Sequence, residues 1–306
     1  MILAAGLTPA WQQILRFEDF RPGEVNRASE AHWCPSGKVL NVGLALAQLG
    51  APCVTLAPLG GAALAPMERA FAELGARRRW IEVERATRVC TTILDAATRQ
   101  TTELVENAGP LAAGELQRFA GAFAELASTA RLVVLTGSLT HGAPPTFFRE
   151  LAAQAPCPVL LDIRGPELLA ALACRPLVVK PNREELAHTL GDDLRDDAAL
   201  HRAMHAVNEQ GAQWVVITSG AAPVWASSQG RLYRFATPPV EVQNPIGSGD
   251  CLMAGLAWGL LDGMEPLEAI CLGMAAAAEN VTRILPADVD APRVLRRRAS
   301  VNYVAV

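Results

Sequence analysis

The chain has 306 residues, of which 51% are hydrophobic and 19% are charged, and its formal net charge is −4. This composition excludes a disordered chain and is sufficient for one large buried core. The slightly acidic balance gives no general attraction to nucleic acid or to an anionic membrane, so we expect neither as a partner.

The chain begins with an apolar stretch, Met1–Gly6, that has no basic segment before it and is interrupted by Thr8-Pro9. We therefore expect a first core strand here and not a secretion signal. The most apolar later stretch, 251–262, is too short to span a bilayer. Seven cysteines without a Cys-x-x-Cys pair indicate reduced thiols, so a cytoplasmic location is expected.

Two polar, alternating segments, 12–34 and about 87–106, predict antiparallel strands of a small sheet that acts as a lid over a cleft. In the rest of the chain, apolar runs of strand length alternate with helical patterns. The predicted helices are 39–49, 66–75, 114–127, 144–154, 183–190 and 197–210. The predicted strands of the main sheet after the first are 53–56, 132–135, 159–162, 177–179 and 214–218.

Strands that are almost entirely Val and Leu, separated by helices, predict a mostly parallel sheet that is buried on both faces. We therefore expect a single α/β doubly wound domain over residues 1–306, with the lid strands inserted into it. Sheets of this kind bind their ligands at the carboxyl ends of the strands.

The segment with the clearest chemistry is Asn-Pro-Ile-Gly-Ser-Gly-Asp-Cys at 244–251, immediately before a helix-like run. At the start of a helix, the backbone N–H groups of Gly247, Ser248 and Gly249 can form an anion hole for a phosphoryl group. Asp250, in the first turn, can accept the proton of an attacking hydroxyl group. The alternative is an ordinary Asp cap beside flexible glycines.

Other phosphate and metal motifs are absent. The segment 36–39, Ser-Gly-Lys-Val, lacks the first Gly and the last Ser or Thr of a P-loop, and no complete Gly-x-Gly-x-x-Gly is present. His201 and His205 have the spacing of a zinc helix, but Arg202 stands where a metalloprotease has Glu, so no zinc site is expected.

The motif at 244–250 resembles the Gly-Ala-Gly-Asp signature of the ribokinase-like, PfkB-type carbohydrate kinases. The resemblance extends along the whole chain and is strongest to the branch of 1-phosphofructokinases and tagatose-6-phosphate kinases. The segments that resemble this branch are Phe20–Arg27, Ser36–Val42, Thr87-Arg88, Thr101–Glu103, Gly109-Pro110, Thr136–Leu139, Lys180–Leu186 and Asn244–Asp250.

The resemblance implies roles for residues on the nucleotide side. Asp250 would be the catalytic base, with Gly247, Ser248 and Gly249 around the transferred phosphoryl group. Lys180 would neutralise phosphate charge, and Ser219 and Gly220 would bind nucleotide; a strand-end surface lysine and an ordinary turn are the alternatives. Asn182 and Glu185, on one helical face, would position Mg²⁺ through water, which suits a cation that keeps its waters.

On the acceptor side, the resemblance implies that Gly37, Lys38, Asn41 and Arg88 face the sugar or its existing phosphate. Arg is well suited to bidentate phosphate binding. Arg88 could instead be a surface cation of the lid, and Asn41 could make local backbone bonds at a helix start.

The sugar side also departs from the family pattern. Gln12 stands where the family has the Asp that binds sugar hydroxyls, and Ser36 and Val39 replace glycines of the sugar loop. A β-branched residue at position 39 tolerates positive φ poorly. Arg164 replaces a Ser in the Asp-x-Ser-Gly element, which places a cation near the expected cleft.

We therefore expect ATP-dependent phosphorylation of a hydroxyl group on a small sugar or sugar phosphate, with a ketohexose phosphate favoured and with ATP and Mg²⁺ as cofactors. The alternatives are a non-catalytic homologue that binds a sugar phosphate or nucleotide, and a kinase for a nucleoside-like acceptor. Family members often dimerise through the lid sheet, so a homodimer is expected.

Overall fold

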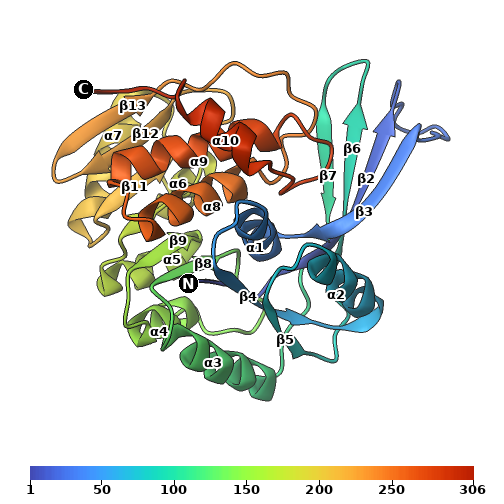
Figure 1. The fold of residues 1–306 in the computed structure, drawn as a ribbon, viewed down its shortest axis with the longest axis horizontal. Helices are drawn as coiled ribbons and strands as arrows, with labels where there is room; N and C mark the ends of the chain where they lie inside the picture. The colour runs from blue at the N-terminus through green and yellow to red at the C-terminus, as the bar shows by residue number, and fades with distance from the viewer.

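The computed structural model describes all residues, 1–306, as one large sheet with helices on both faces and a second, smaller sheet (Figure 1). The large sheet has ten strands in the spatial order β14 (Tyr303–Ala305), β13 (Arg231–Phe235), β12 (Val224–Ser228), β11 (Trp214–Ile217), β10 (Val178–Val179), β9 (Val159–Asp162), β8 (Leu132–Thr136), β1 (Ile2–Ala5), β4 (Cys53–Leu59) and β5 (Arg78–Glu82). All neighbouring pairs from β11 to β5 are parallel, and β12, β13 and β14 join antiparallel.

Two hydrophobic cores lie on the two faces of this sheet, because successive side chains of a strand point to opposite faces. In β1, Ile2 and Ala4 belong to one core and Leu3 and Ala5 to the other. The first core is covered by α1 (Lys38–Gln48), α2 (Leu64–Glu73), α8 (Ser248–Leu261), α9 (Pro266–Asn280) and α10 (Ala291–Arg298). The second is covered by α3 (Ala113–Ala127), α4 (Phe147–Gln154), α5 (Gly165–Ala171), α6 (Arg183–Leu190) and α7 (Asp197–Glu209). Two short 3₁₀ turns, Gly61–Ala63 and Leu172–Cys174, precede α2 and follow α5.

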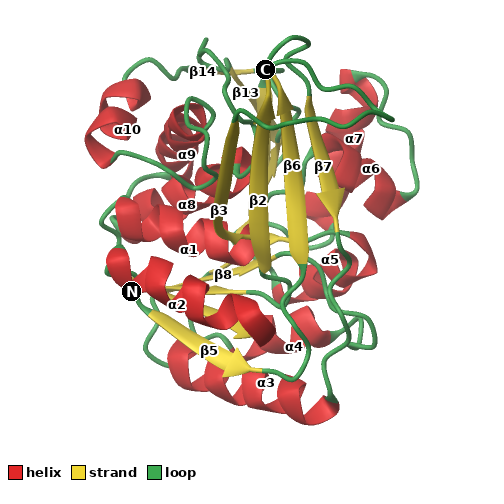
Figure 2. Ribbon diagram, turned by 90° about the vertical axis from the view of Figure 1, so that its right-hand side faces the viewer, coloured by secondary structure: helices red, strands yellow, loops and turns green.

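The small sheet has the order β3 (Glu30–Ser36), β2 (Ala10–Phe17), β6 (Val89–Asp95) and β7 (Thr101–Val105), and it projects from the main body (Figures 1 and 2). Its two hairpins are antiparallel, but the central pair β2–β6 is parallel. The prediction of antiparallel strands was therefore wrong for this pair. Both β2 and β6 follow strands of the parallel main sheet, β1 and β5, so they leave the same edge in the same direction.

The mostly parallel α/β architecture was predicted, and the six predicted helices are present with ends that differ by at most a few residues. Helices α5, α9 and α10 and strands β5 and β12 to β14 were not predicted. None of the helices has the length and apolar character needed to cross a membrane.

Candidate active site

The start of α8 has a backbone conformation that only glycine adopts easily. Gly247, the N-cap, has φ +81°, and a Cβ atom here would lie 2.9 Å from Cβ of Pro286. The N–H groups of Gly247, Gly249 and Asp250 donate no hydrogen bond within the chain. These three groups are therefore free to bind an anion. The helix dipole adds positive potential at the same end of α8.

The amide of Ser248 differs from its neighbours, because its N–H donates to the carbonyl oxygen of Pro245 at 3.3 Å. The anion site that was predicted from Gly247, Ser248 and Gly249 is therefore shifted in the structure: the amide of Asp250 is open, and that of Ser248 is engaged in the turn.

Asp250 lies beside these open amides and is almost completely buried. Its Oδ2 accepts a hydrogen bond of 2.7 Å from Nδ2 of Asn41, in α1. Burial, followed by the negative charge of Asp162, raises the pKa of Asp250 to about 7. A carboxyl group with a pKa near neutrality is suited to take a proton from a hydroxyl group and to release it again.

Two lysines and two carboxylates form a charged network next to Asp250. Nζ of Lys38 lies 2.9 Å from Oδ1 of Asp162 and 2.8 Å from Oε1 of Glu185. Nζ of Lys180 lies 3.2 Å from Oδ2 of Asp162, whose side chain is fully buried. Asp162 therefore connects the start of α1 to the strand end that precedes α6.

The pKa values of Lys38 and Asp162 favour the charged forms of these two side chains. Burial alone would lower the pKa of Lys38, but Asp162 and then Glu185 outweigh it and raise that pKa above its usual range. Burial alone would raise the pKa of Asp162, but Lys180 and Lys38 outweigh it and hold that pKa below its usual value. Lys38 and Asp162 are thus both charged at neutral pH.

Asn182 and Glu185 form a reciprocal capping box at the start of α6. Oδ1 of Asn182 accepts from the backbone N–H of Glu185 at 2.7 Å, and Oε2 of Glu185 accepts from that of Asn182 at 3.0 Å. They were predicted to share a helical face, but Asn182 is the N-cap and lies outside the helix. The chain contains no group of three or more His, Cys, Asp or Glu side chains arranged to hold a metal ion.

A polar cleft of about 400 Å³ connects these groups to the small sheet. It brings together every predicted site residue except Ser219. The predicted residues that line it are Gln12, Gly37, Lys38, Asn41, Arg88, Lys180, Asn182, Glu185, Gly220, Gly247, Ser248, Gly249 and Asp250.

Gln12 and Arg88 enter the cleft from the small sheet, and both already make hydrogen bonds within the chain. Nε2 of Gln12 donates to Oγ1 of Thr92 at 2.7 Å. The guanidinium group of Arg88 donates to the carbonyl oxygens of Thr8, Pro9 and Glu106 at 3.1 to 3.3 Å. Three of its five N–H donors are therefore committed to the backbone.

The departures at positions 36 and 39 do not strain the backbone. Gly37 alone in this loop has positive φ, +84°, and a Cβ atom here would lie 2.7 Å from the carbonyl oxygen of Thr8. Val39 is a buried residue of α1, in helical conformation, and Ser36 ends β3. The expectation that Val39 disturbs a glycine conformation was wrong, because the helix already begins at Lys38.

The prediction that Arg164 brings a cation to the cleft was also wrong. Arg164 lines a separate, smaller pocket with Ser138 and His188. The side chain of Asn41 makes no local backbone bond of the kind considered as an alternative, because it donates to Asp250.

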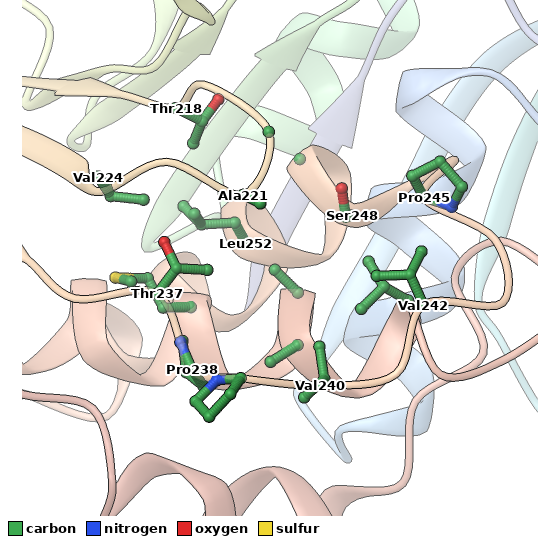
Figure 3. Close-up of a pocket in the computed structure, with 17 residues that line it drawn as sticks. Thr218, Ala221, Val224, Thr237, Pro238, Val240, Val242, Pro245, Ser248 and Leu252 are labelled. Carbon is green, nitrogen blue, oxygen red and sulfur yellow. The ribbon is translucent and has the colours of Figure 1, made fainter. Parts of the chain in front are cut away.

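A second, mostly apolar cavity of about 480 Å³ lies on the other side of the α8 start (Figure 3). Its walls are the segment 237–242, the start of α8 and one face of α9. It shares five residues with the polar cleft, namely Thr218, Gly220, Pro245, Ser248 and Gly249. The open amides of α8 therefore lie where an apolar pocket and a polar cleft meet.

Two parts of this site were missed in the sequence. Asp162, fully buried between two lysines, is the last residue of a predicted strand, and this position at a carboxyl strand end could have marked it as a site residue. The apolar wall that comprises Thr237, Pro238, Pro239 and Val240 has a Pro-rich sequence without periodicity, so no pattern marked it as part of a pocket.

Comparisons with known proteins agree on one family. The family model described as pfkB family carbohydrate kinase matches residues 3–292. A 1-phosphofructokinase from Xanthomonas campestris pv. campestris is 37% identical over 282 residues, which cover 89% of this chain and 87% of that protein.

Solved structures have the same fold. A protein described as a possible 1-phosphofructokinase from Thermotoga maritima superposes with a TM-score of 0.92 at 22% identity, over 100% of this chain and 99% of the other. A ribokinase from the same organism gives a TM-score of 0.77 at 20% identity, over 97% and 99% of the two chains. The ribokinase-like fold that was expected from the sequence is therefore confirmed.

Proposed function

The chain belongs to the pfkB family of carbohydrate kinases, and we propose that it transfers the γ-phosphoryl group of ATP to a hydroxyl group of a ketohexose phosphate. The observation that carries this proposal is the position of Asp250. Its carboxyl group, with a pKa of about 7, lies beside open backbone amides where an apolar pocket and a polar cleft meet.

In this proposal the apolar cavity takes the nucleotide base, and the triphosphate reaches the start of α8. Ser248 and Gly249 belong to both cavities, so the γ-phosphoryl group would lie against the open amides of Gly247, Gly249 and Asp250. These amides stabilise the charge that develops on the phosphoryl oxygens during transfer. A Cβ atom on Gly249 would lie 3.5 Å from Nζ of Lys180, so this lysine adds positive charge at the same place.

The acceptor occupies the polar cleft with its reactive hydroxyl group against Asp250. The carboxylate takes the hydroxyl proton as the oxygen attacks the phosphorus atom in line with the leaving ADP oxygen. Asn41 holds the carboxylate in place through its hydrogen bond to Oδ2. The small sheet acts as a lid that positions the acceptor and excludes water.

Magnesium enters as part of the substrate Mg·ATP. The residues proposed to position it, Asn182 and Glu185, already use their oxygens in the capping box and in the bond to Lys38. These two side chains therefore do not fit direct coordination of Mg²⁺. We propose that they contact the ion through the water molecules of its hydration shell.

A ketohexose phosphate is the favoured acceptor for two reasons. The Xanthomonas relative, at 37% identity, is a 1-phosphofructokinase. The cleft is lined mainly by polar and charged side chains, and only 4 of its 22 lining residues are hydrophobic, which suits a hydroxylated, charged acceptor better than a nucleoside base.

The outer face of the small sheet supports a homodimer. Trp33 is 48% exposed and stacks on Trp11 with ring centroids 6.0 Å apart, and Leu104, on the far edge strand, is 56% exposed. A second copy would cover these apolar groups and the open sheet edge. Light scattering should give twice the chain mass for the wild type and a smaller mass for Trp33→Lys; a wild-type monomer would contradict the dimer. We also propose a cytoplasmic location, which a sequence with seven cysteines and no Cys-x-x-Cys pair favours.

The proposed function is tested by ADP release from Mg·ATP across a panel of acceptors. The panel contains fructose 1-phosphate, fructose 6-phosphate, tagatose 6-phosphate, free hexoses, ribose and nucleosides. We expect turnover with a phosphorylated ketohexose at the highest kcat/KM. Turnover only with a nucleoside, or ATP binding without turnover of any acceptor, would contradict the proposal and favour one of the alternative functions.

A further inference from the structure

The polar cleft contains four acidic side chains, and one of them has no partner. Asp162 and Glu185 are paired with lysines, and Asp250 accepts a hydrogen bond from Asn41. The fourth, Glu103, lines the cleft from an exposed position on β7 and takes part in none of the side-chain hydrogen bonds or ion pairs of the chain. The other three carboxylates are thus held by the protein, whereas Glu103 is free to bind a ligand.

Glu103 lies on β7, the edge strand of the small sheet, and faces the cleft. It is paired in register with Thr92 of β6, whose hydroxyl group accepts the hydrogen bond from Gln12. Paired residues of adjacent strands point to the same face, so Glu103 and Gln12 belong to one wall of the cleft. Its neighbour Leu104 points to the opposite, outer face and is largely exposed.

The surroundings of Glu103 favour a neutral, hydrogen-bond-donating ligand. Although Glu103 is an exposed residue, partial removal of its carboxyl group from water raises its pKa, and Arg88 partly offsets this. The nearby donors are only partly available, because Arg88 gives three of its five N–H groups to backbone carbonyl groups and Gln12 donates to Thr92. A free carboxylate here would repel the phosphate of an acceptor but accept hydrogen bonds from its hydroxyl groups.

We propose that Glu103 is a specificity-determining residue that accepts hydrogen bonds from hydroxyl groups of the acceptor sugar, from the β7 wall of the polar cleft. This inference rests on the proposed function and adds a negatively charged contact on the lid side, where Gln12 offers only a neutral amide. The phosphate of the acceptor then points away from β7.

Calorimetry tests this contact without turnover. Fructose 1-phosphate, or the acceptor that the panel identifies, is titrated into Asp250→Asn protein with and without Glu103→Gln. A hydrogen bond to a charged group is lost, so we expect the Kd for the acceptor to rise about tenfold or more. The Kd for Mg·ATP should stay within about twofold, because Glu103 does not line the cavity proposed for the nucleotide. Glu30→Gln, at the far end of the small sheet, is the matched control and should change neither value.

Steady-state kinetics with monodeoxy analogues of the acceptor then identify the contact. In otherwise wild-type protein, one analogue should lose much of its kcat/KM relative to the parent sugar phosphate, and Glu103→Gln should remove most of that difference. An active wild type whose acceptor Kd is unchanged by both Glu103→Gln and Glu103→Ala would overturn the role of Glu103 and leave the proposed function standing. A wild type without activity toward any sugar acceptor would overturn both.

Discussion

Nδ2 of Asn41 lies 2.7 Å from Oδ2 of Asp250, although 209 positions separate the two residues in the chain. Asn41 belongs to the first turn of α1 and Asp250 to the first turn of α8. The two helix starts therefore meet at the carboxylate. Helix α1, which follows β3 of the small sheet, orients the proposed catalytic base.

The first prediction concerns this hydrogen bond. The donated N–H favours the ionised form of Asp250 and lowers its pKa, so Asn41→Ala should raise that pKa. We expect the acidic limb of the kcat/KM profile to move to higher pH and kcat to fall about tenfold or more. Asn208→Ala is the control, because Asn208 bonds to Ser227 in a region remote from the cleft. An unchanged pH profile in Asn41→Ala would show that Asn41 does not influence the pKa of the catalytic base.

The second prediction concerns the pH dependence of the wild type. Burial and the charge of Asp162 raise the pKa of Asp250 to about 7, and only the ionised form can accept a proton. Activity should therefore be present above this pKa and lost as the pH falls through it. Between pH 8 and pH 6, kcat/KM should fall about tenfold. A profile that is flat over this range would contradict the assignment of Asp250 as base.

The third prediction concerns the buried ion pairs of Asp162. Asp162→Asn leaves Lys180 without its ion-pair partner and Lys38 with only Glu185. Removing one partner of a buried pair costs about 3–5 kcal/mol, so the free energy of unfolding should fall by about that amount. Urea denaturation measures it. Asp19→Asn breaks an exposed pair with Arg21 and should cost less than about 1 kcal/mol. Equal losses of unfolding free energy in the two variants would show that the buried ion pairs of Asp162 stabilise the fold no more than an exposed pair does.

The fourth prediction concerns the apolar cavity. Ala277, on α9, lines this cavity but not the polar cleft. Ala277→Phe should fill part of the proposed base pocket, raising KM for ATP about tenfold while KM for the acceptor changes little. Ala124→Phe, on an exposed position of α3, provides the control. If KM for the acceptor rose and KM for ATP did not, the apolar cavity would be the acceptor site and not the nucleotide site.

The fold was predictable because its signals are local. Strands such as Leu132–Thr136 are continuous apolar runs, and helices such as α7 have clear periodicity. Strands β12 to β14 were missed because they join the sheet antiparallel after the regular alternation ends. The parallel pairing of β2 with β6 depends on where two hairpins, far apart in the sequence, leave the main sheet. A local sequence pattern carries no information about this arrangement.

The candidate site was predictable in its residues but not in its contacts. Most residues of the motif at 244–250, and Lys180 and Asn182 of the Lys-Pro-Asn segment, line the same cleft. The pairing of Lys38 with Asp162 and Glu185 joins positions 124 and 147 apart, so spacing could not reveal it. The same is true of Arg164, whose place outside the cleft follows from the direction of the chain after β9.

The most direct test of the central claim is the rate of phosphoryl transfer from Mg·ATP to fructose 1-phosphate by the wild type and by Asp250→Asn, with both substrates saturating. We predict that the wild type forms a bisphosphate and ADP in equal amounts. The variant should still bind both substrates but be slower by about two to four orders of magnitude, the usual contribution of a general base. A variant that binds both substrates and turns over at a near-normal rate would contradict the role of Asp250 as the general base.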